Sequence, residues 1–291
     1  MSPVFAPLEV LWPLFAIALV AAAVNGGIGY GFSSITLPVA LLLRTSRVLN
    51  PALVLIEVVL NLASLWANRR LVPAALLRVR PMLLGVVPGV AAGSLVLAWV
   101  DPGWLKLFTF AVLLPLVLLQ AAGIRRPLRD ERRAAVPAGA ALGLLYGATT
   151  ISGPPLALLF NNQGLSRDQF RAAIAVFRTA ESICATIACL ALGLLTAEPL
   201  RLAGALLPVV LVGFPLGFLL LRRIPAGTFR RACMAVDGLL VGFGLARSLI
   251  EQGLASPAVA WASLAALACL EAALLAVQLR NLERTTLTEH A

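Results

Sequence analysis

The chain alternates between long apolar segments and short stretches rich in arginine. Two segments stand out because no charged residue occurs from Val10 to Leu43 or from Ala134 to Ser166. A helix of that length would measure roughly 50 Å at about 1.5 Å per residue, whereas the hydrocarbon core of a bilayer is about 30 Å thick. Each of the two segments is therefore too long for one crossing and too short for two. The pattern predicts apolar segments at about 8–43, 49–67, 82–100, 105–122, 134–160, 170–195, 202–221, 232–250 and 257–279.

The two long segments both contain glycines and prolines at the point where a helix would have to break. The first break lies at 25–34, ahead of Pro38, and the second at 147–153, ahead of Pro154 and Pro155. A broken helix at membrane depth is tolerated only where it is buried in protein or lines a wet cavity. Matching breaks in the two halves of a chain are typical of a transporter's binding site. We therefore expect the two breaks to meet near the middle of the membrane, in one cavity.

Composition agrees with a membrane protein. The chain is 60% hydrophobic and only 12% charged, whereas about a quarter of the residues of a soluble domain are charged. The net charge of +10 is concentrated in short loops, so it indicates topology and not a nucleic-acid surface. The cysteines and the single histidine form no cluster with metal-ligand spacing, so we expect no cofactor and no metal.

The fold class that these features predict is an all-α polytopic membrane protein with two four-segment repeats, each opening with a broken helix. The repeats would occupy 1–124 and 134–251, joined by a basic loop at 125–133 and followed by an extra transmembrane helix and tail at 252–291. Gly85, Gly89 and Gly93 form a row of small residues at every fourth position, which favours close helix contact.

Loop charge predicts that the repeats are inverted relative to each other. Basic loops lie in the cytoplasm, which assigns 69–80, 125–133 and 222–231 to that side and 101–103 and 196–201 to the other. Inversion needs an odd number of crossings per half, which is met if the broken segments are re-entrant. The alternative is eight full spans in parallel repeats, which leaves the loop at 222–231 on the wrong side.

The breaks supply candidate substrate-binding groups. The half-helices that restart after each break expose N–H groups and a partial positive charge, which favours an anion. The alternative is that the glycines only allow packing and the hydroxyls bond their own backbone. The candidates at the breaks are Asn25, Gly29, Tyr30, Gly31, Ser33, Ser34, Thr149, Thr150, Ser152 and Gly153.

Charged residues inside the segments supply the remaining candidates. Arg178 stands out as the only arginine deep in a span, and a charge there is a functional hypothesis by default. Glu181 shares its helix face, and Glu57 and Asn61 lie on the corresponding segment of the first half. Aligning Pro38 with Pro155 sets Asn61 opposite Arg178. Two interpretations stay open: Arg178 binds an anionic substrate while Glu57 or Glu181 carries a coupling proton, with Asn61 beside them, or Arg178 pairs with a glutamate and fixes helix packing.

The quoted motifs resemble those of the sulfite exporter TauE/SafE family of bacterial membrane proteins. The resemblance is carried by Gly-Ile-Gly-Tyr-Gly followed by Leu-Pro38, and by Gly147 through Pro155 together with Phe170-Arg171, and it covers about residues 8–250. It implies a multi-pass protein of the bacterial inner membrane that transports small anions, sulfite or organosulfonates among them.

Three classes of function are weighed. A secondary transporter of a small sulfur-containing or carboxylate anion leads, and its coupling would be to an ion gradient because the chain has no nucleotide-binding loop. An intramembrane enzyme is disfavoured, since the segments contain no Cys/His or Ser/His constellation. A structural membrane protein would not need paired broken helices. The expected partners are a small anion and the lipid bilayer, with no nucleic acid, and a homo-oligomer is left open.

Overall fold

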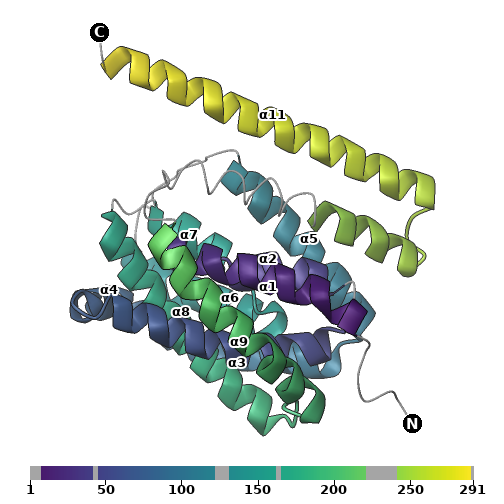
Figure 1. The fold of residues 1–291 in the computed structure, drawn as a ribbon, viewed down its shortest axis with the longest axis horizontal. Coiled ribbons are helices and arrows are strands. Elements are labelled where there is room, and N and C mark those ends of the chain that lie inside the picture. Colours follow the sequence, from purple (N-terminus) through teal and green to yellow (C-terminus); the bar gives the residue numbers. More distant parts are fainter. Residues whose placement is uncertain (1–7, 42–44, 122–130, 162–164, 221–240, 290–291) are drawn as a thin grey trace.

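The computed structural model describes residues 8–41, 45–121, 131–161, 165–220 and 241–289. The regular structure in these ranges is helical (Figure 1). The helices are α1 Leu8–Ile28, α2 Phe32–Ala40, α3 Ser46–Ala67, α4 Val72–Trp99, α5 Pro102–Ala121, α6 Glu131–Thr149, α7 Gly153–Asn161, α8 Arg167–Ala191, α9 Ala197–Leu220 and α11 Pro257–Glu289. Residues 241–251 are helical as well.

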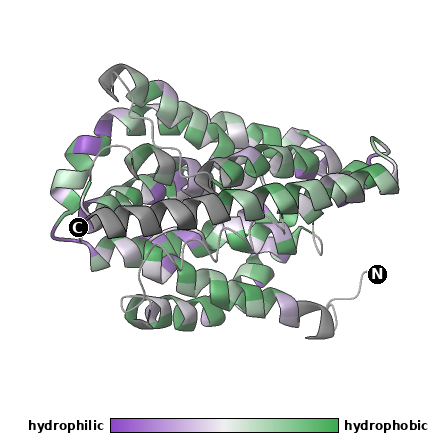
Figure 2. Ribbon diagram, turned by 90° about the horizontal axis from the view of Figure 1, so that it is seen from above, coloured by the Kyte–Doolittle hydropathy of each residue, from purple (hydrophilic) through white to green (hydrophobic). Residues whose placement is uncertain are grey.

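The helices carry apolar side chains on their outer faces, as expected for a protein in lipid. Within the described ranges, five helical spans are long and apolar enough to cross a membrane: Ser46–Ala67, Val72–Trp99, Asp168–Ala191, Ala197–Leu219 and Pro257–Leu274. Large side chains such as Leu84, Leu190 and Leu219 are about two-thirds exposed on these spans. The ribbons are correspondingly coloured as hydrophobic over most of their length (Figure 2). A membrane location follows from this surface.

Several helices extend beyond the apolar segments that the sequence pattern predicted. The segment expected to begin at Met82 is α4, which begins at Val72, so Arg78 and Arg80 lie on a helix and not in a loop. Pro73 fits the first turn of α4 because that turn needs no internal N–H donor. Likewise α11 continues past residue 279. The reason is that charge ends a membrane span but does not end a helix.

Two helix starts follow from capping side chains. Ser166 and Gln169 form a capping box at the start of α8. The carboxylate of Asp101 accepts from the N–H of Gly103 at 2.8 Å, at the start of α5. Asp237, the loop at 222–231 and residues 125–130 of the predicted basic loop lie outside the described residues.

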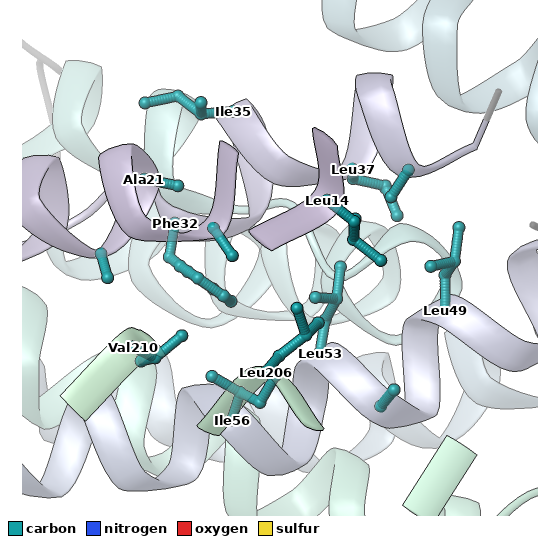
Figure 3. Close-up of a cluster of buried hydrophobic side chains, with 14 of the residues drawn as sticks. Leu14, Ala21, Phe32, Ile35, Leu37, Leu49, Leu53, Ile56, Leu206 and Val210 are labelled. Carbon is teal, nitrogen blue, oxygen red and sulfur yellow. The ribbon is translucent and has the colours of Figure 1, made fainter. Parts of the chain in front are cut away.

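Among the described residues, two main apolar clusters form the interior, and each combines residues from both halves of the chain. One cluster packs α1, α2 and α3 against Leu206 and Val210 of α9 (Figure 3). The other packs α4 with α6, α7 and α8, and it includes Tyr30 and Val54 from the first half. The helices of residues 1–124 are therefore interleaved with those of residues 134–251 in the folded core.

Two helix pairs approach so closely that their glycines cannot be replaced without a clash. A Cβ at Gly85, Gly89 or Gly93 of α4 would collide with the backbone of α6, which confirms the close contact expected from this row. In the same way, a Cβ at Gly26 of α1 or Gly217 of α9 would collide with the backbone of the other helix. The broken helix of each half thus packs on a long helix of the other half.

Helix α11 lies along one side of the bundle, away from most other helices (Figure 1). It contacts α5 and the helical stretch 241–251, where Phe243 and Trp261 pack with ring centroids 5.5 Å apart. Most of its described side chains are exposed. This placement agrees with a helix appended to the bundle.

Candidate functional site

The first break separates α1 from α2 by a three-residue turn. Gly29 and Gly31 have φ angles of 99° and 108°, a region that side chains other than glycine rarely occupy. The carbonyl of Gly31 accepts from the N–H of Ile35 at 3.1 Å, which starts α2. The N–H groups of Phe32, Ser33 and Ser34 precede that bond and have no partner inside the helix. All three residues are buried, so the start of α2 presents donors inside the protein.

The second break separates α6 from α7 and is less rich in backbone donors. Thr150 has a φ of 58°, and the carbonyl of Ser152 accepts from the N–H of Leu156 at 3.0 Å, which starts α7. Pro154 and Pro155 have no N–H, so Gly153 supplies the donor of the first turn. The start of α2 therefore offers more free N–H donors than the start of α7.

Several hydroxyls at the breaks bond their own backbone. The Oγ1 of Thr149 donates to the carbonyl of Leu145 at 2.6 Å, and that of Thr150 donates to the carbonyl of Thr149 at 2.6 Å. The Oγ of Ser34 donates to the carbonyl of Gly31 at 3.3 Å. For these residues the structure agrees with the local alternative, since each hydroxyl is used to hold the break itself.

The two breaks lie against each other. A Cβ added to Gly153 would be 3.2 Å from the Cδ2 of Tyr30 and 3.8 Å from the N of Gly31. Tyr30 is itself buried, and its ring packs edge-on to Phe170 with centroids 6.3 Å apart. The two breaks are therefore in contact, as expected, whereas their depth in the membrane and the shared cavity stay predictions.

Beside the breaks, a buried ion pair joins α3 to α8. The Nη2 of Arg178 donates to the Oε1 of Glu57, and both side chains are about 1% exposed or less. Tyr146 completes the arrangement, because its hydroxyl donates to the Oε2 of Glu57 at 2.6 Å and its ring lies 5.0 Å from the guanidinium. Of the two interpretations of Arg178, the pairing with a glutamate is the one that this geometry supports.

The second break is connected to this pair through Ser152. The Nη1 of Arg178 donates to the Oγ of Ser152 at 2.9 Å, and that hydroxyl donates to the Oε2 of Glu181 at 2.5 Å. The distance from Arg178 Nη1 to Glu181 Oε2 is 4.0 Å, so the two side chains interact mainly through Ser152. Movement of the second break would therefore change the surroundings of both charged groups.

Asn61 holds the backbone of α8. Its Nδ2 donates to the carbonyl of Arg178 and to the Oγ of Ser182, each at 3.2 Å. This role fixes the position of α8 against α3. The geometry therefore gives Asn61 a structural task in the described state.

Some buried polar atoms near the breaks have no hydrogen-bond partner in the described part of the chain. They include both side-chain polar atoms of Asn25, the Oγ1 of Thr36, the Nε of Arg178 and the Oε1 of Glu181. Leaving such an atom unpaired costs about 1–3 kcal/mol, and more when it is charged. Unpaired atoms on α1, α2 and α8 mark this region as one where a polar ligand or water would be stabilised.

Arg171 and Asn50 are site-bordering residues that the sequence reasoning missed. Arg171 is 8% exposed, and its two Nη atoms donate to the carbonyls of Gly26 and Gly27 at 2.9 and 3.0 Å. Asn50 donates from Nδ2 to the carbonyl of Ala148 at 2.7 Å. Each side chain satisfies carbonyls at the C-terminal end of a broken helix.

Arg171 is thus a second buried arginine, although it lies near one end of its span. Arg171 lies at the start of α8, where a long side chain would ordinarily reach water. It is buried because α1 and Phe218 of α9 cover it, with the guanidinium 5.5 Å from that ring. The feature of the sequence that could have identified Arg171 is its place beside Phe170 in the second quoted motif.

A separate cavity lies between the starts of α4 and α8. Its volume is about 420 Å³, and Leu71, Arg78, Leu165 and Gln169 are among its lining residues. None of the predicted site residues lines it. Within the described residues, no group of three or more His, Cys, Asp or Glu side chains could hold a metal ion.

Comparison with known proteins gives one family. The family model described as Sulfite exporter TauE/SafE matches residues 14–245. No curated protein and no solved structure matches the chain. The matched range contains both breaks and every residue of the buried network.

Proposed function

The chain belongs to the sulfite exporter TauE/SafE family, and from that premise we propose that it is a secondary transporter of a small anion across the bacterial inner membrane. The family implies an anion-exporting membrane transporter and not an enzyme. The proposed substrate is sulfite, an organosulfonate or a related sulfur-containing or carboxylate anion. The observation that carries the proposal is the meeting of two broken helices beside a buried Arg178–Glu57 pair.

The fold of this transporter is proposed to consist of two inverted repeats related by a shift of 121 positions. The N–H of Gly29 donates to the carbonyl of Asn25, and the N–H of Thr150 donates to the carbonyl of Tyr146, each at 2.6 Å. Both donors have a positive φ. Helices α2 and α7 begin at residues 32 and 153, and α3 and α8 at residues 46 and 167, the same shift in both cases.

Side-chain contacts across the halves support the same shift. Arg171 donates to the carbonyl of Gly27, and Asn50, its counterpart at this shift, donates to that of Ala148, the counterpart of Gly27. Helix α1 packs on α9 as α6 packs on α4. This register replaces the alignment of Pro38 with Pro155 and sets Glu57, not Asn61, opposite Arg178. The ion pair then lies at the centre of the repeat relation.

The proposed anion site combines the donors at the start of α2 with Arg178 and Asn25. The N–H groups of Phe32, Ser33 and Ser34 carry the partial positive charge of a helix start. The unpaired Nε of Arg178 and Nδ2 of Asn25 are further buried donors. Asn25 corresponds to Tyr146 at this shift, and both of its side-chain polar atoms are unpaired in the described part of the chain, whereas the tyrosine hydroxyl bonds Glu57. An oxyanion needs several such donors, because burying it unpaired is prohibitive.

Flux measurements in proteoliposomes test the function. Purified protein in liposomes is expected to move sulfite or isethionate down an imposed gradient faster than protein-free liposomes do. A panel with acetate and chloride defines the selectivity for sulfur oxyanions. Equal rates with and without protein for every anion of the panel would overturn the proposal.

A further inference from the structure

Resting on this proposed transport function, we infer that Glu181 is the proton-carrying group and that its proton travels in the same direction as the anion. Glu181 lies on α8, fully buried, in contact with the second break through Ser152. The proposed function names only an ion gradient, so the identity of the ion and of its carrier is the new element. Three observations carry the inference.

The first observation is the balance of charge in the buried network. Arg178 donates directly to Glu57 and only approaches Glu181 to 4.0 Å. The titratable and charged groups around Glu181 are Glu57 from α3, Tyr146 from α6, and Arg178 and Cys184 from α8. Arg78 and Arg80 lie near the start of α4. One guanidinium therefore serves two carboxyl groups, and a proton on one of them removes the surplus negative charge.

The second observation is that Glu181, not Glu57, is the carboxyl group suited to that proton. Glu57 is held at both oxygens, by Arg178 and by Tyr146. Glu181 is held at Oε2 by Ser152, and its buried Oε1 has no partner in the described part of the chain. A proton on Oε1 would keep every existing bond of the network.

The third observation comes from the 121-position shift. Glu57 and Arg178 are counterparts and neutralise each other, whereas the counterpart of Glu181 is Leu60, a buried apolar residue. The carboxyl group of Glu181 is therefore an addition to the symmetric arrangement that holds the two halves together. An ionisable group inside a membrane protein that packing does not require is a candidate for a proton relay.

The step itself is a proton transfer with no change in oxidation state. When the site opens to water, the O–H bond of the Glu181 carboxyl breaks and the proton leaves to a water molecule. When the site opens to the other side, a hydronium ion there returns a proton to the carboxylate. The neutral carboxyl removes a repulsive charge from the site, so proton and anion are bound together.

The first experiment follows protons in the wild-type protein. Proteoliposomes enclosing a pH-sensitive dye receive an inward gradient of isethionate, a permanently ionised sulfonate, with sulfite as the second probe. Acidification of the lumen with each anion that enters is expected. Anion entry without acidification, or with alkalinisation, would overturn the inference while leaving the transport function standing. If neither these two anions nor any other anion of the panel moves faster with protein than without it, the transport function and the inference both fall.

The second experiment compares Glu181→Gln with Glu251→Gln. The glutamine can accept the bond from Ser152 but cannot release a proton, so acidification on anion entry should be lost and the flux should become independent of pH. Glu251 pairs with Lys106 at 2.9 Å at the surface, and its substitution should keep the wild-type pH profile. Proton entry that persists in Glu181→Gln would contradict the assignment.

A third variant, Ser152→Ala, keeps the test decisive if Glu181→Gln does not accumulate. Loss of the donor to Oε2 makes the carboxylate less favourable, so the midpoint of the pH profile should move to higher pH by about one unit. An unshifted midpoint would contradict a proton on Glu181. A merely structural role for Ser152 would lower the amount of protein without moving the midpoint.

Discussion

Replacement of Arg178 by Gln tests whether the buried pair holds α3 against α8. The substitution removes the donor to Glu57 Oε1 and leaves that carboxylate, which is 0% exposed, with the Tyr146 hydroxyl. Breaking a buried pair by removing one partner costs about 3–5 kcal/mol, since the remaining charge is uncompensated. Total stabilities of about 5–15 kcal/mol leave little margin for such a loss. The variant should therefore accumulate poorly in the membrane.

The double variant Arg178→Gln with Glu57→Gln separates the structural role from the transport role. It removes both charges, so accumulation should return towards the wild-type amount. The control double variant, Arg178→Gln with Glu181→Gln, leaves Glu57 stranded and should not recover. Membrane amounts are measured on a tagged protein, and thermal unfolding in detergent gives the change in stability.

Two results would refute this reasoning. If Arg178→Gln alone accumulates and melts like the wild type, the pair does not stabilise the fold. If the rescued double variant also transports the anion at the wild-type rate, Arg178 does not serve the substrate. The donors at the start of α2 and Asn25 would then form the whole anion site.

Three further predictions use matched pairs or matched loops. Asn25→Leu removes unpaired polar atoms and should lower anion flux without lowering the melting temperature. Its control, Asn50→Leu, loses the bond to Ala148 and should destabilise the protein by about 1–3 kcal/mol. Wild-type flux in Asn25→Leu would show that Asn25 does not belong to the anion site. Gly89→Ala forces a Cβ into the backbone of α6 and should cost about 1–3 kcal/mol in thermal unfolding, while Gly204→Ala meets open space and should be neutral. Cysteine labelling should reach residues 69–71 and 222–231 from the cytoplasm. If 222–231 is labelled from outside while 69–71 is not, the inverted arrangement is contradicted.

Local chemistry determined much of the fold directly from the sequence. The apolar runs predicted the helices, and the positive φ angles at Gly29 and Gly31 explain why the first break lies where glycines cluster. The capping box before α8 was readable for the same reason, because its two residues contact each other within one turn. The row Gly85 to Gly93 indicated a close helix contact but not its partner.

Tertiary structure decided the partners and therefore the roles. Arg178 had two glutamates within reach by sequence, and only the packing of α3 on α8 brought Glu57 to its guanidinium. The burial of Arg171 likewise depends on α1 and α9, which cover its guanidinium. Such contacts join residues that are far apart in the sequence, and their register depends on how whole helices interlock. Hydropathy and spacing predict which face of a helix is buried, but they do not predict which helix packs against that face.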